Sequence, residues 1–361
     1  MMTVRSHPGV RAVDPAAWDA VVAEGSPFLE HTFLSALEES GAVGEGTGWT
    51  PCPVTAWEGD RLVGVAPAYL KRHSYGEYVY DWQIANWAAR RGMPWYPKLV
   101  VAVPFTPVTG SRLCVAPGVP AAGVIDALLG GLARLGAQTP GLHVLFPGAA
   151  ETEALVARGG IRRVQWQYHW QNKGFGTFDD FLASVPSRRR NTIRRERREV
   201  AGVPIEAREG AAPGLAATLW EFYAATYQRH TGGEGYLNAA FFEILCARWG
   251  HRIHTVLARD PSGRPFAGTF NVRKGDRLYG RWWGATQEVP FLHFEVAIYA
   301  AVEWCIANRI AVFEPGHGGE HKHARGFEPV STSSVHWIRD PRLAVALADL
   351  FQREAATMGV P

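Results

Sequence analysis

The sequence predicts an α/β (α+β) protein that carries two copies of one domain. Residues 142–148 (LHVLFPG) match residues 310–316 (IAVFEPG) at an offset of 168. The tripeptide ARG recurs at 157–159 and 324–326, an offset of 167. Strand and helix patterns also follow one another in the same order in both halves. Because matched segments recur in the same order, we interpret the chain as an internal duplication.

The duplication sets the predicted domain boundaries. A chain of 361 residues with 47% apolar residues can bury two hydrophobic cores. We expect an N-terminal domain at 1–172 and a C-terminal domain at 211–361, each with a mixed sheet flanked by helices. Residues 173–210 are predicted to form a basic helical linker.

In the first half, apolar spacing and turn residues predict two helices, a hairpin, a further strand, and then helix, strand, helix and strand. The hairpin follows from the turn Glu58-Gly59-Asp60 between two apolar runs. Residues 78–82 alternate like a strand, and 84–91 could form a helical turn or lid. The predicted helices are 15–24, 28–39, 121–135 and 151–157, and the strands are 53–57, 62–71, 98–103, 142–146 and 165–170.

The second half repeats this order after a short helix at 178–185 and an arginine-rich helix from 187 to 200. Turns at Asp260–Gly263 and Lys274–Asp276 separate three predicted strands. The predicted helices are 215–229, 238–249, 293–308 and 341–357, and the strands are 253–258, 266–273, 277–284, 311–314 and 335–338.

A charged loop follows the strand that ends at Glu314. Ligands in open α/β sheets bind beyond the carboxyl ends of strands, so we interpret this loop as the floor of a site. Acylation of an amine needs a base and a group that stabilises an oxyanion. The candidate catalytic residues are Glu314, His317, Glu320, His321 and Lys322, and Arg325 is a candidate for substrate binding.

Within this loop, Lys322 or Arg325 could face the developing negative charge. We expect Lys322 to behave as a surface lysine whose loss the fold tolerates. Two alternatives remain open. The loop could be solvated and merely salt-bridged, or His317, His321 and His323 could bind a metal with Glu320.

The arginine-rich segment concentrates the positive charge of the chain. Residues 187–200 hold seven Arg and two Glu, a charge of +5, so the rest of the chain carries 3 − 5 = −2. Arginine suits phosphate because its donors form a fork. We predict that Arg190, Arg194, Arg195 and Arg198 bind phosphate or tRNA. A solvated helix on an acidic surface, or a contact with a membrane surface, would explain the same charges.

Further candidates for substrate binding are polar or aromatic residues near predicted strand ends. They are Tyr80, Asp81, Trp82 and Lys98 in the first half, and Tyr279, Arg281 and Glu295 in the second. Half-buried packing and ion pairs at the core edge would explain them equally well.

The sequence shows neither a signal peptide nor an apolar run of about 18 residues, so we expect no integral membrane contact. The four cysteines, Cys52, Cys114, Cys246 and Cys305, lie far apart and lack metal-binding spacing. Reduced thiols and a cytoplasmic location fit this pattern best.

Several segments resemble the FemAB-like family of peptidoglycan biosynthesis/recognition proteins, within the GNAT acyltransferase superfamily. They run from about residue 28 to the C-terminus. The segments are HSYGEYVYDW (73–82), YPKL (96–99), VPFTPVTG (103–110), NTIRRER (191–197), FLHFE (291–295), GEHK (319–322) and ARGF (324–327).

The resemblance implies a tandem duplicated GNAT-like fold and transfer of an acyl or aminoacyl group to an amine, in small molecules or peptides. The pyrophosphate loop that GNAT enzymes use for acyl-CoA is missing from 106–111 and 287–292. We therefore expect no tightly bound cofactor and a donor that is aminoacyl-tRNA, as in the Fem enzymes, rather than acyl-CoA. The alternatives are a coenzyme A-dependent N-acetyltransferase and a non-catalytic binding protein for an anionic cell-wall precursor.

Overall fold

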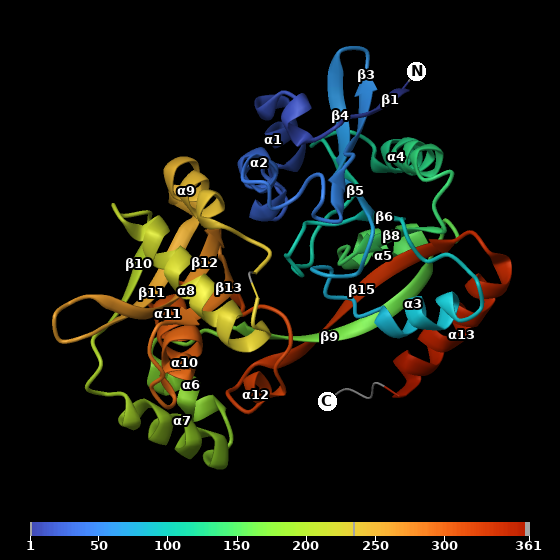
Figure 1. The fold of residues 1–361 in the computed structure, drawn as a ribbon. Coiled ribbons are helices and arrows are strands. Elements are labelled where there is room, and N and C mark those ends of the chain that lie inside the picture. The colour runs from blue at the N-terminus through green and yellow to red at the C-terminus, as the bar shows by residue number, and fades with distance from the viewer. Residues whose placement is uncertain (1, 234, 358–361) are drawn as a thin grey trace. The chain divides into compact units, whose positions relative to one another are not determined.

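The computed structural model describes residues 2–233 and 235–357, which form two compact units. The first unit contains Met1–Gln165 and Ser331–Pro361, and the second contains Trp166–Val330. Figure 1 shows the helices and strands of both. None of the helices in these described ranges combines the length and apolar character that crossing a bilayer requires.

In the first unit the paired strands follow the orders β1-β3-β4-β7 and β15-β8-β6-β5-β2. Helix α4 packs on β1, β3 and β4 around a core that includes Val54, Val63 and Leu128. The strands are β1 (Met2–Ser6), β2 (Trp49–Pro51), β3 (Val54–Glu58), β4 (Arg61–Ala66), β5 (Ala68–Lys71), β6 (Lys98–Val101), β7 (Cys114–Val115), β8 (Gly141–Leu145), β9 (Ile161–Gln171) and β15 (Glu328–Ile338). The helices are η1 (Val10–Ala12), α1 (Pro15–Val22), η2 (Pro27–Leu29), α2 (His31–Glu39), α3 (Trp82–Ala89), α4 (Ala121–Leu135), α5 (Ala149–Val156) and α13 (Pro341–Thr357).

In the second unit the paired strands follow the order β10-β11-β12-β13-β14-β9. Helix α8 packs against β12 and β13 (Figure 1). The strands are β10 (Ile205–Glu209), β11 (Ile253–Arg259), β12 (Pro265–Lys274), β13 (Arg277–Ala285) and β14 (Val312–Glu314). The helices are α6 (Phe178–Ser184), α7 (Ser187–Glu199), α8 (Leu215–Thr231), α9 (Ala239–Arg248), η3 (Gly250–Arg252), α10 (Leu292–Phe294), the π-helical η4 (Glu295–Tyr299), α11 (Ala300–Ala307) and α12 (Glu320–His323).

The element order of the first unit recurs in the second. In both, two helices precede antiparallel strands, and a later strand returns parallel to one of them. The parallel pairs are β6 with β8 and β13 with β14. Strands β8 and β14 contain the residues that match at the offset of 168. Both are followed by a helix.

The last strand of each copy does not stay in one unit. Gln171 and Trp170 at the end of β9 pair with β14 in the second unit. Residues 334–338 at the end of β15 pair with β8 in the first unit. The strand pairing of β9 and β15 therefore does not follow the predicted domain boundaries at 172 and 211. The predicted linker at 173–210 is also part of the second unit, because Ile193 and Val200 of this segment are buried in its core.

Three predicted elements differ from the structure. Residues 78–81 form a loop that leads into α3, not a strand, and Tyr78 and Tyr80 have positive φ angles of 61° and 49°. The strand predicted at 62–71 is broken between β4 and β5, at Pro67. The helix predicted at 293–308 contains the π-helical stretch η4. A proline cannot donate to a ladder, which accounts for the second difference.

We expect Gly284→Ala to destabilise the second unit, because α8 lies directly on β13 at this point. A Cβ atom at Gly284 would lie 2.1 Å from the Phe222 carbonyl oxygen. Overpacking against backbone costs about 1–3 kcal/mol or more. Urea unfolding should show a lower midpoint for this variant.

The matched control is Gly123→Ala on α4, where a Cβ atom would meet nothing within 4 Å. Alanine favours a helix by up to about 1 kcal/mol, so this control should be neutral or stabilising. Equal midpoints for the two variants would contradict the close approach.

Candidate functional site

The candidate site lies in the second unit, where β13 and β14 stop being paired. Their parallel ladder ends at Tyr279 and Glu314. Pro315 then passes close to β13, since a Cβ atom at Gly280 would lie 3.1 Å from the Pro315 Cα atom. The chain continues as a loop to α12. The carboxyl end of β14 thus opens onto the charged loop, as the sequence predicts.

A β-bulge in β13 places Arg281 at this end. Phe270 of β12 pairs with Trp282 while Asn271 pairs with Gly280, so Arg281 is the extra residue. Bulges redirect a side chain and are frequent near active sites. The Arg281 guanidinium lowers the pKa values of Glu314, His317 and Lys322, although burial is the larger influence on each. The charge of Arg281 therefore acts on the titratable residues of the loop.

Glu314 is a buried carboxylate at the end of β14. Its Oε1 atom accepts a hydrogen bond of 2.9 Å from Arg277 Nη1, and its Oε2 atom lies 3.8 Å from His169 Nε2. Burial raises the pKa of Glu314 to about 7, against the opposing charges of Arg277 and Arg281. A carboxyl group with this pKa can exchange a proton near neutral pH.

Lys322 is buried, so the expectation of a surface lysine is wrong. Its Nζ atom donates to the carbonyl oxygens of Gly316 at 2.7 Å and His317 at 3.3 Å. These bonds hold the loop that precedes α12 against this helix. Burial, and then the charge of Arg281, lowers the pKa of Lys322 to about 8.

Two histidines of the loop, His317 and His321, have lowered pKa values. Burial, then Lys322 and Arg281, lowers the pKa of His317 to about 4. Burial also lowers the pKa of His321, whose ring centre lies 6.1 Å from that of His293. The side chain of Glu320 lies outside the described part of the structure. Within that part, no three His, Cys, Asp or Glu residues lie close enough together to hold a metal ion.

Arg325 and Glu295, both predicted to bind substrate, form ion pairs with residues of α7. Arg325 is buried and donates to Glu196 of α7 at 2.6 and 3.1 Å, and to the His321 carbonyl oxygen at 2.8 Å. Tyr299 donates to the same Glu196. Glu295 pairs with Arg197 at 3.0 Å. Both charges are compensated by these ion pairs. The pairs hold α7 against the rest of the second unit. Tyr279 is buried beside Glu314 in the ladder, as predicted for a strand end.

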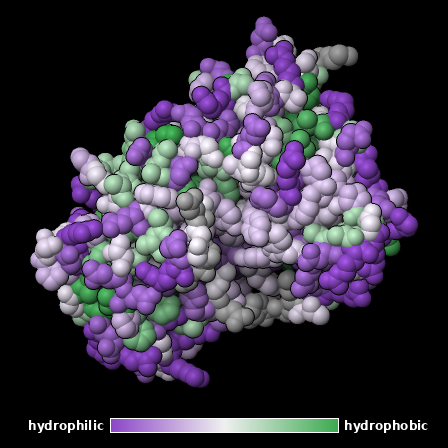
Figure 2. All heavy atoms as spheres, viewed as in Figure 1, coloured by the Kyte–Doolittle hydropathy of each residue, from purple (hydrophilic) through white to green (hydrophobic). Residues whose placement is uncertain are grey.

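Helix α7 has an anchored side and an exposed side. Ile193 and Glu196 are buried, and Arg189 donates to His323 at 2.9 Å. Arg190, predicted to bind phosphate, is instead half-buried and donates to the Val185 carbonyl oxygen at 3.4 Å. The exposed arginines, which have no carboxylate partner within the described ranges, are Arg188, Arg194, Arg195 and Arg198. Hydrophilic residues dominate the region of α7 in Figure 2.

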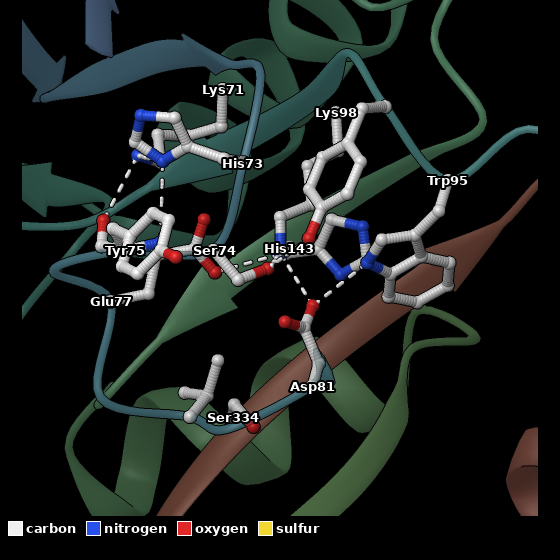
Figure 3. Close-up of polar contacts among 12 residues, drawn as sticks. Lys71, His73, Ser74, Tyr75, Glu77, Asp81, Trp95, Lys98, His143 and Ser334 are labelled. Atoms are coloured by element: carbon white, nitrogen blue, oxygen red, sulfur yellow. Dashed lines mark hydrogen bonds and ion pairs between the residues drawn. The ribbon is translucent and has the colours of Figure 1, made fainter. Parts of the chain in front are cut away.

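The candidates of the first unit separate into buried and exposed groups. Lys98 forms ion pairs with Glu77 at 2.7 Å and Asp81 at 2.5 Å, and Trp95 donates to Asp81 at 2.9 Å (Figure 3). Burial alone would lower the pKa of Lys98, but the two carboxylates outweigh it and raise the pKa. Asp81 and Lys98 are thus buried in an ion-pair cluster that holds the 73–81 loop.

Two aromatic candidates of this loop region differ in exposure. The Tyr80 residue is 54% exposed. Trp82 is half-buried and contacts Tyr75, with ring centres 4.5 Å apart. Tyr80 is therefore the more accessible of the two for a ligand.

Sequence reasoning missed His169, Arg277 and Glu196. His169 carried a signal, because His169-Trp170 repeats as His336-Trp337 in the second copy. Arg277 follows a turn and gives no local sign that it meets Glu314. Glu196 is 129 residues from Arg325, so nothing in the sequence joins the two.

A protein-family model named FemAB-like, described as peptidoglycan biosynthesis/recognition, matches residues 9–360. The chain belongs to the FemAB-like family. No curated protein sequence matches this FemAB-like chain.

Solved structures share the fold of this family member. FemX has a TM-score of 0.55 at 11% identity, covering 95% of this chain and 100% of its own. L-PGS from Bacillus licheniformis has a TM-score of 0.53 at 10% identity, covering 94% and 97%. A tandem GNAT protein from the clavulanic acid biosynthesis pathway scores 0.47 at 12% identity, covering 94% and 98%. The two structures with TM-scores above 0.5, FemX and L-PGS, confirm the predicted α/β fold.

We expect Lys98→Met to destabilise this FemAB-like protein strongly. Removing the lysine leaves Glu77 and Asp81 buried without their partner, and breaking a buried pair costs about 3–5 kcal/mol. Thermal unfolding should show the loss.

Lys173→Met is the control, because Lys173 pairs with Glu328 at 2.5 Å on the surface. Exposed pairs contribute about 0–1 kcal/mol. A Lys98→Met variant as stable as this control would show that the buried cluster contributes little.

Proposed function

We propose that this FemAB-like protein transfers an acyl or aminoacyl group to an amine, with Glu314 as the base. The observation that carries the proposal is the buried Glu314 carboxylate, with a pKa of about 7, at the carboxyl end of a parallel strand pair. Family membership and the shared fold support it. A peptide amine of a peptidoglycan-type precursor is the acceptor that the family description favours.

The proposed reaction starts with an acceptor that arrives as an ammonium ion. The Glu314 carboxylate takes one proton, and the neutral nitrogen attacks the acyl carbonyl carbon. A tetrahedral oxyanion forms, and the positive charge of Arg281 favours it. The intermediate collapses, the bond to the donor oxygen breaks, and the proton on Glu314 passes to that oxygen. The regenerated Glu314 carboxylate takes the second proton from the attacking nitrogen and releases it to water. An amide and a free donor hydroxyl result.

Lys322 has a supporting role in this proposal. Its ammonium group is bonded to the carbonyl oxygens of Gly316 and His317, which fixes the loop beside Glu314. Its charge adds to the positive field of Arg281. We assign it positioning of the loop rather than direct proton transfer.

We propose aminoacyl-tRNA as the donor, with the exposed face of α7 as the phosphate contact. Four exposed arginines on one short helix, without carboxylate partners in the part of the chain described, favour a polyanion. Acyl-CoA is the competing donor. A direct test incubates the protein with a muramyl pentapeptide that has a free side-chain amine. Radiolabelled aminoacyl-tRNA and acetyl-CoA are supplied in parallel reactions, and transfer from acetyl-CoA alone would overturn the tRNA assignment.

Glu314→Gln should lower the transfer rate by about 100- to 10,000-fold, the range for loss of a general acid or base. In the native protein the rate should fall as the pH drops below about 7, because the protonated carboxyl cannot accept the ammonium proton. Initial rates between pH 5.5 and 8.5 measure both effects.

The control is Glu328→Gln, a half-exposed carboxylate in the same unit. It should keep the native rate and the same acid limb. A Glu314→Gln variant that is correctly folded and turns over near the native rate would remove Glu314 from the mechanism.

Replacing Arg194, Arg195 and Arg198 together by Glu should weaken tRNA binding and flatten its dependence on salt. Each phosphate contact contributes a slope of roughly −0.9 in log K against log salt on duplex regions, so the slope should shrink by up to about 3. Filter binding from 50 to 300 mM salt measures it.

The matched control replaces Arg61, Arg90 and Arg208, three exposed arginines elsewhere, by Glu. The change in net charge is identical. Equal loss of affinity in both triple variants would mean that net charge, and not α7, attracts the tRNA.

A further inference from the structure

A groove of about 470 Å³ lies in the first unit between α4 and the paired ends of β8 and β15. On α4 its lining runs from Asp126 to Gly136, a distance of about 15 Å along a helix axis. Pockets for small ligands have volumes of about 300–1,000 Å³ and mostly apolar walls. The groove therefore has room for a small ligand that lies along the helix.

The walls of the groove are apolar side chains, most of which the fold leaves partly uncovered. They are Leu129 and Leu132 of α4, Leu142 of β8, and Trp337 and Ile338 of β15. Leu129, Leu142 and Trp337 pack against the core of this unit, yet none of the three is fully buried. The Trp337 indole is held in place, because its N–H group donates to the Arg158 carbonyl oxygen at 3.2 Å. The groove thus presents an apolar surface that is already formed.

Two adjacent glycines of α4 have different surroundings. A Cβ atom at Gly131 would lie 2.4 Å from Val4 and 3.1 Å from Val54, so packing against β1 and β3 requires this glycine. A Cβ atom at Gly130, which lines the groove, would meet only the end of the Arg134 side chain, at 3.6 Å. Glycine inside a helix is less favourable than alanine. Packing therefore does not account for Gly130, whose missing side chain keeps this part of the groove open.

One guanidinium group of the groove has no carboxylate partner in the described part of the chain. Arg158 is paired with Asp126 at 2.6 Å. Arg339 donates from Nε to the carbonyl oxygen of Thr139 at 2.9 Å and from Nη2 to that of Gly136 at 3.0 Å. Both of these acceptors are uncharged. The charge of Arg339 therefore remains at the Gly136 end of the groove.

The groups next to the groove leave its charge positive. Asp340 pairs with Arg342 at 3.0 Å, and Arg134 adds a positive charge beside Gly130. His143 is buried near Gly141, and burial lowers the pKa of its imidazole well below the usual value. The last carbonyl groups of α4 carry about half a negative charge, which offsets only part of the positive sum. An anion is therefore favoured at this end.

We propose that this groove binds a fatty acid. The alkyl chain covers the apolar walls and passes close to the helix at Gly130. The carboxylate lies at the Gly136 end, where Nη1 of Arg339 can donate to it. A small hydrophilic anion would leave the apolar walls in water, and an uncharged chain would leave the guanidinium without an anion. The site is independent of the proposed transfer reaction, because it shares no residue with it.

The test titrates the full chain with dodecanoate by isothermal calorimetry. Dodecyltrimethylammonium carries the same chain with the opposite charge, and acetate carries the charge without the chain. We expect saturable binding of dodecanoate, binding of the cation that is at least about tenfold weaker, and no binding of acetate at the same concentrations. Arg339→Gln should weaken dodecanoate binding by at least about tenfold, as expected for loss of one charge-assisted hydrogen bond, and should not weaken binding of the cation.

Gly130→Leu fills the groove and should weaken dodecanoate binding by more than about tenfold. Its matched control is Gly123→Leu, because Gly123 is on the same helix but outside the groove, and a Cβ atom there would meet nothing within 4 Å. The control should change the affinity less than twofold. Leucine favours a helix more than glycine does, so neither variant should melt at a lower temperature.

Three results would overturn the proposal. They are the absence of saturable heat with submillimolar dodecanoate, equal loss of affinity in the two leucine variants, and binding of dodecyltrimethylammonium as tight as that of dodecanoate. Sedimentation velocity tests the competing occupant, a second copy of the chain, since a dimer that Gly130→Leu dissociates would make the groove an interface instead. Gly130→Leu tests the groove even if Arg339→Gln unfolds.

Discussion

The candidate site depends on the point where two parallel strands separate. Strand β14 ends because Pro315 has no N–H group with which to continue the ladder. Strand β13 continues against β12, and its glycine at 280 lets the departing chain pass closely. One extra residue in β13, Arg281, is displaced by the bulge. A proline, a glycine and a bulge thus create the end of the sheet that Glu314 occupies.

Charges in this protein divide into those with partners and those without. Lys98, Arg325 and Glu295 are buried and paired, since an isolated charge away from water is unfavourable. Helix α7 shows both kinds. Its Glu196 and Arg197 face the protein, while four arginines face the solvent. The positive charge of the 187–200 segment is therefore available on one side of the helix only.

Periodicity and the internal repeat predicted most strands of both units, because each alternates or is uniformly apolar over a short range. They also predicted the charged loop after β14 and the buried strand β8. The burial of Lys322 was not predicted, because it depends on how the loop turns back to bring the carbonyl oxygens of Gly316 and His317 to its ammonium group. The ion pair of Arg325 was not predicted either, because its glutamate lies 129 residues away. The 78–81 segment alternates like a strand, but left-handed residues and ion pairs to Lys98 determine its path. Long-range contacts of this kind leave no local pattern.

The exchange of final strands affects how the protein is made. Strand β8 pairs with residues 334–338, which leave the ribosome almost 190 residues after it. Its edge stays open while about half of the chain is synthesised, a period in which an unpaired strand is exposed to wrong partners. Each copy therefore depends on the other for one strand of its sheet. A gene that ends after the first copy would encode a sheet without the strand that borders β8.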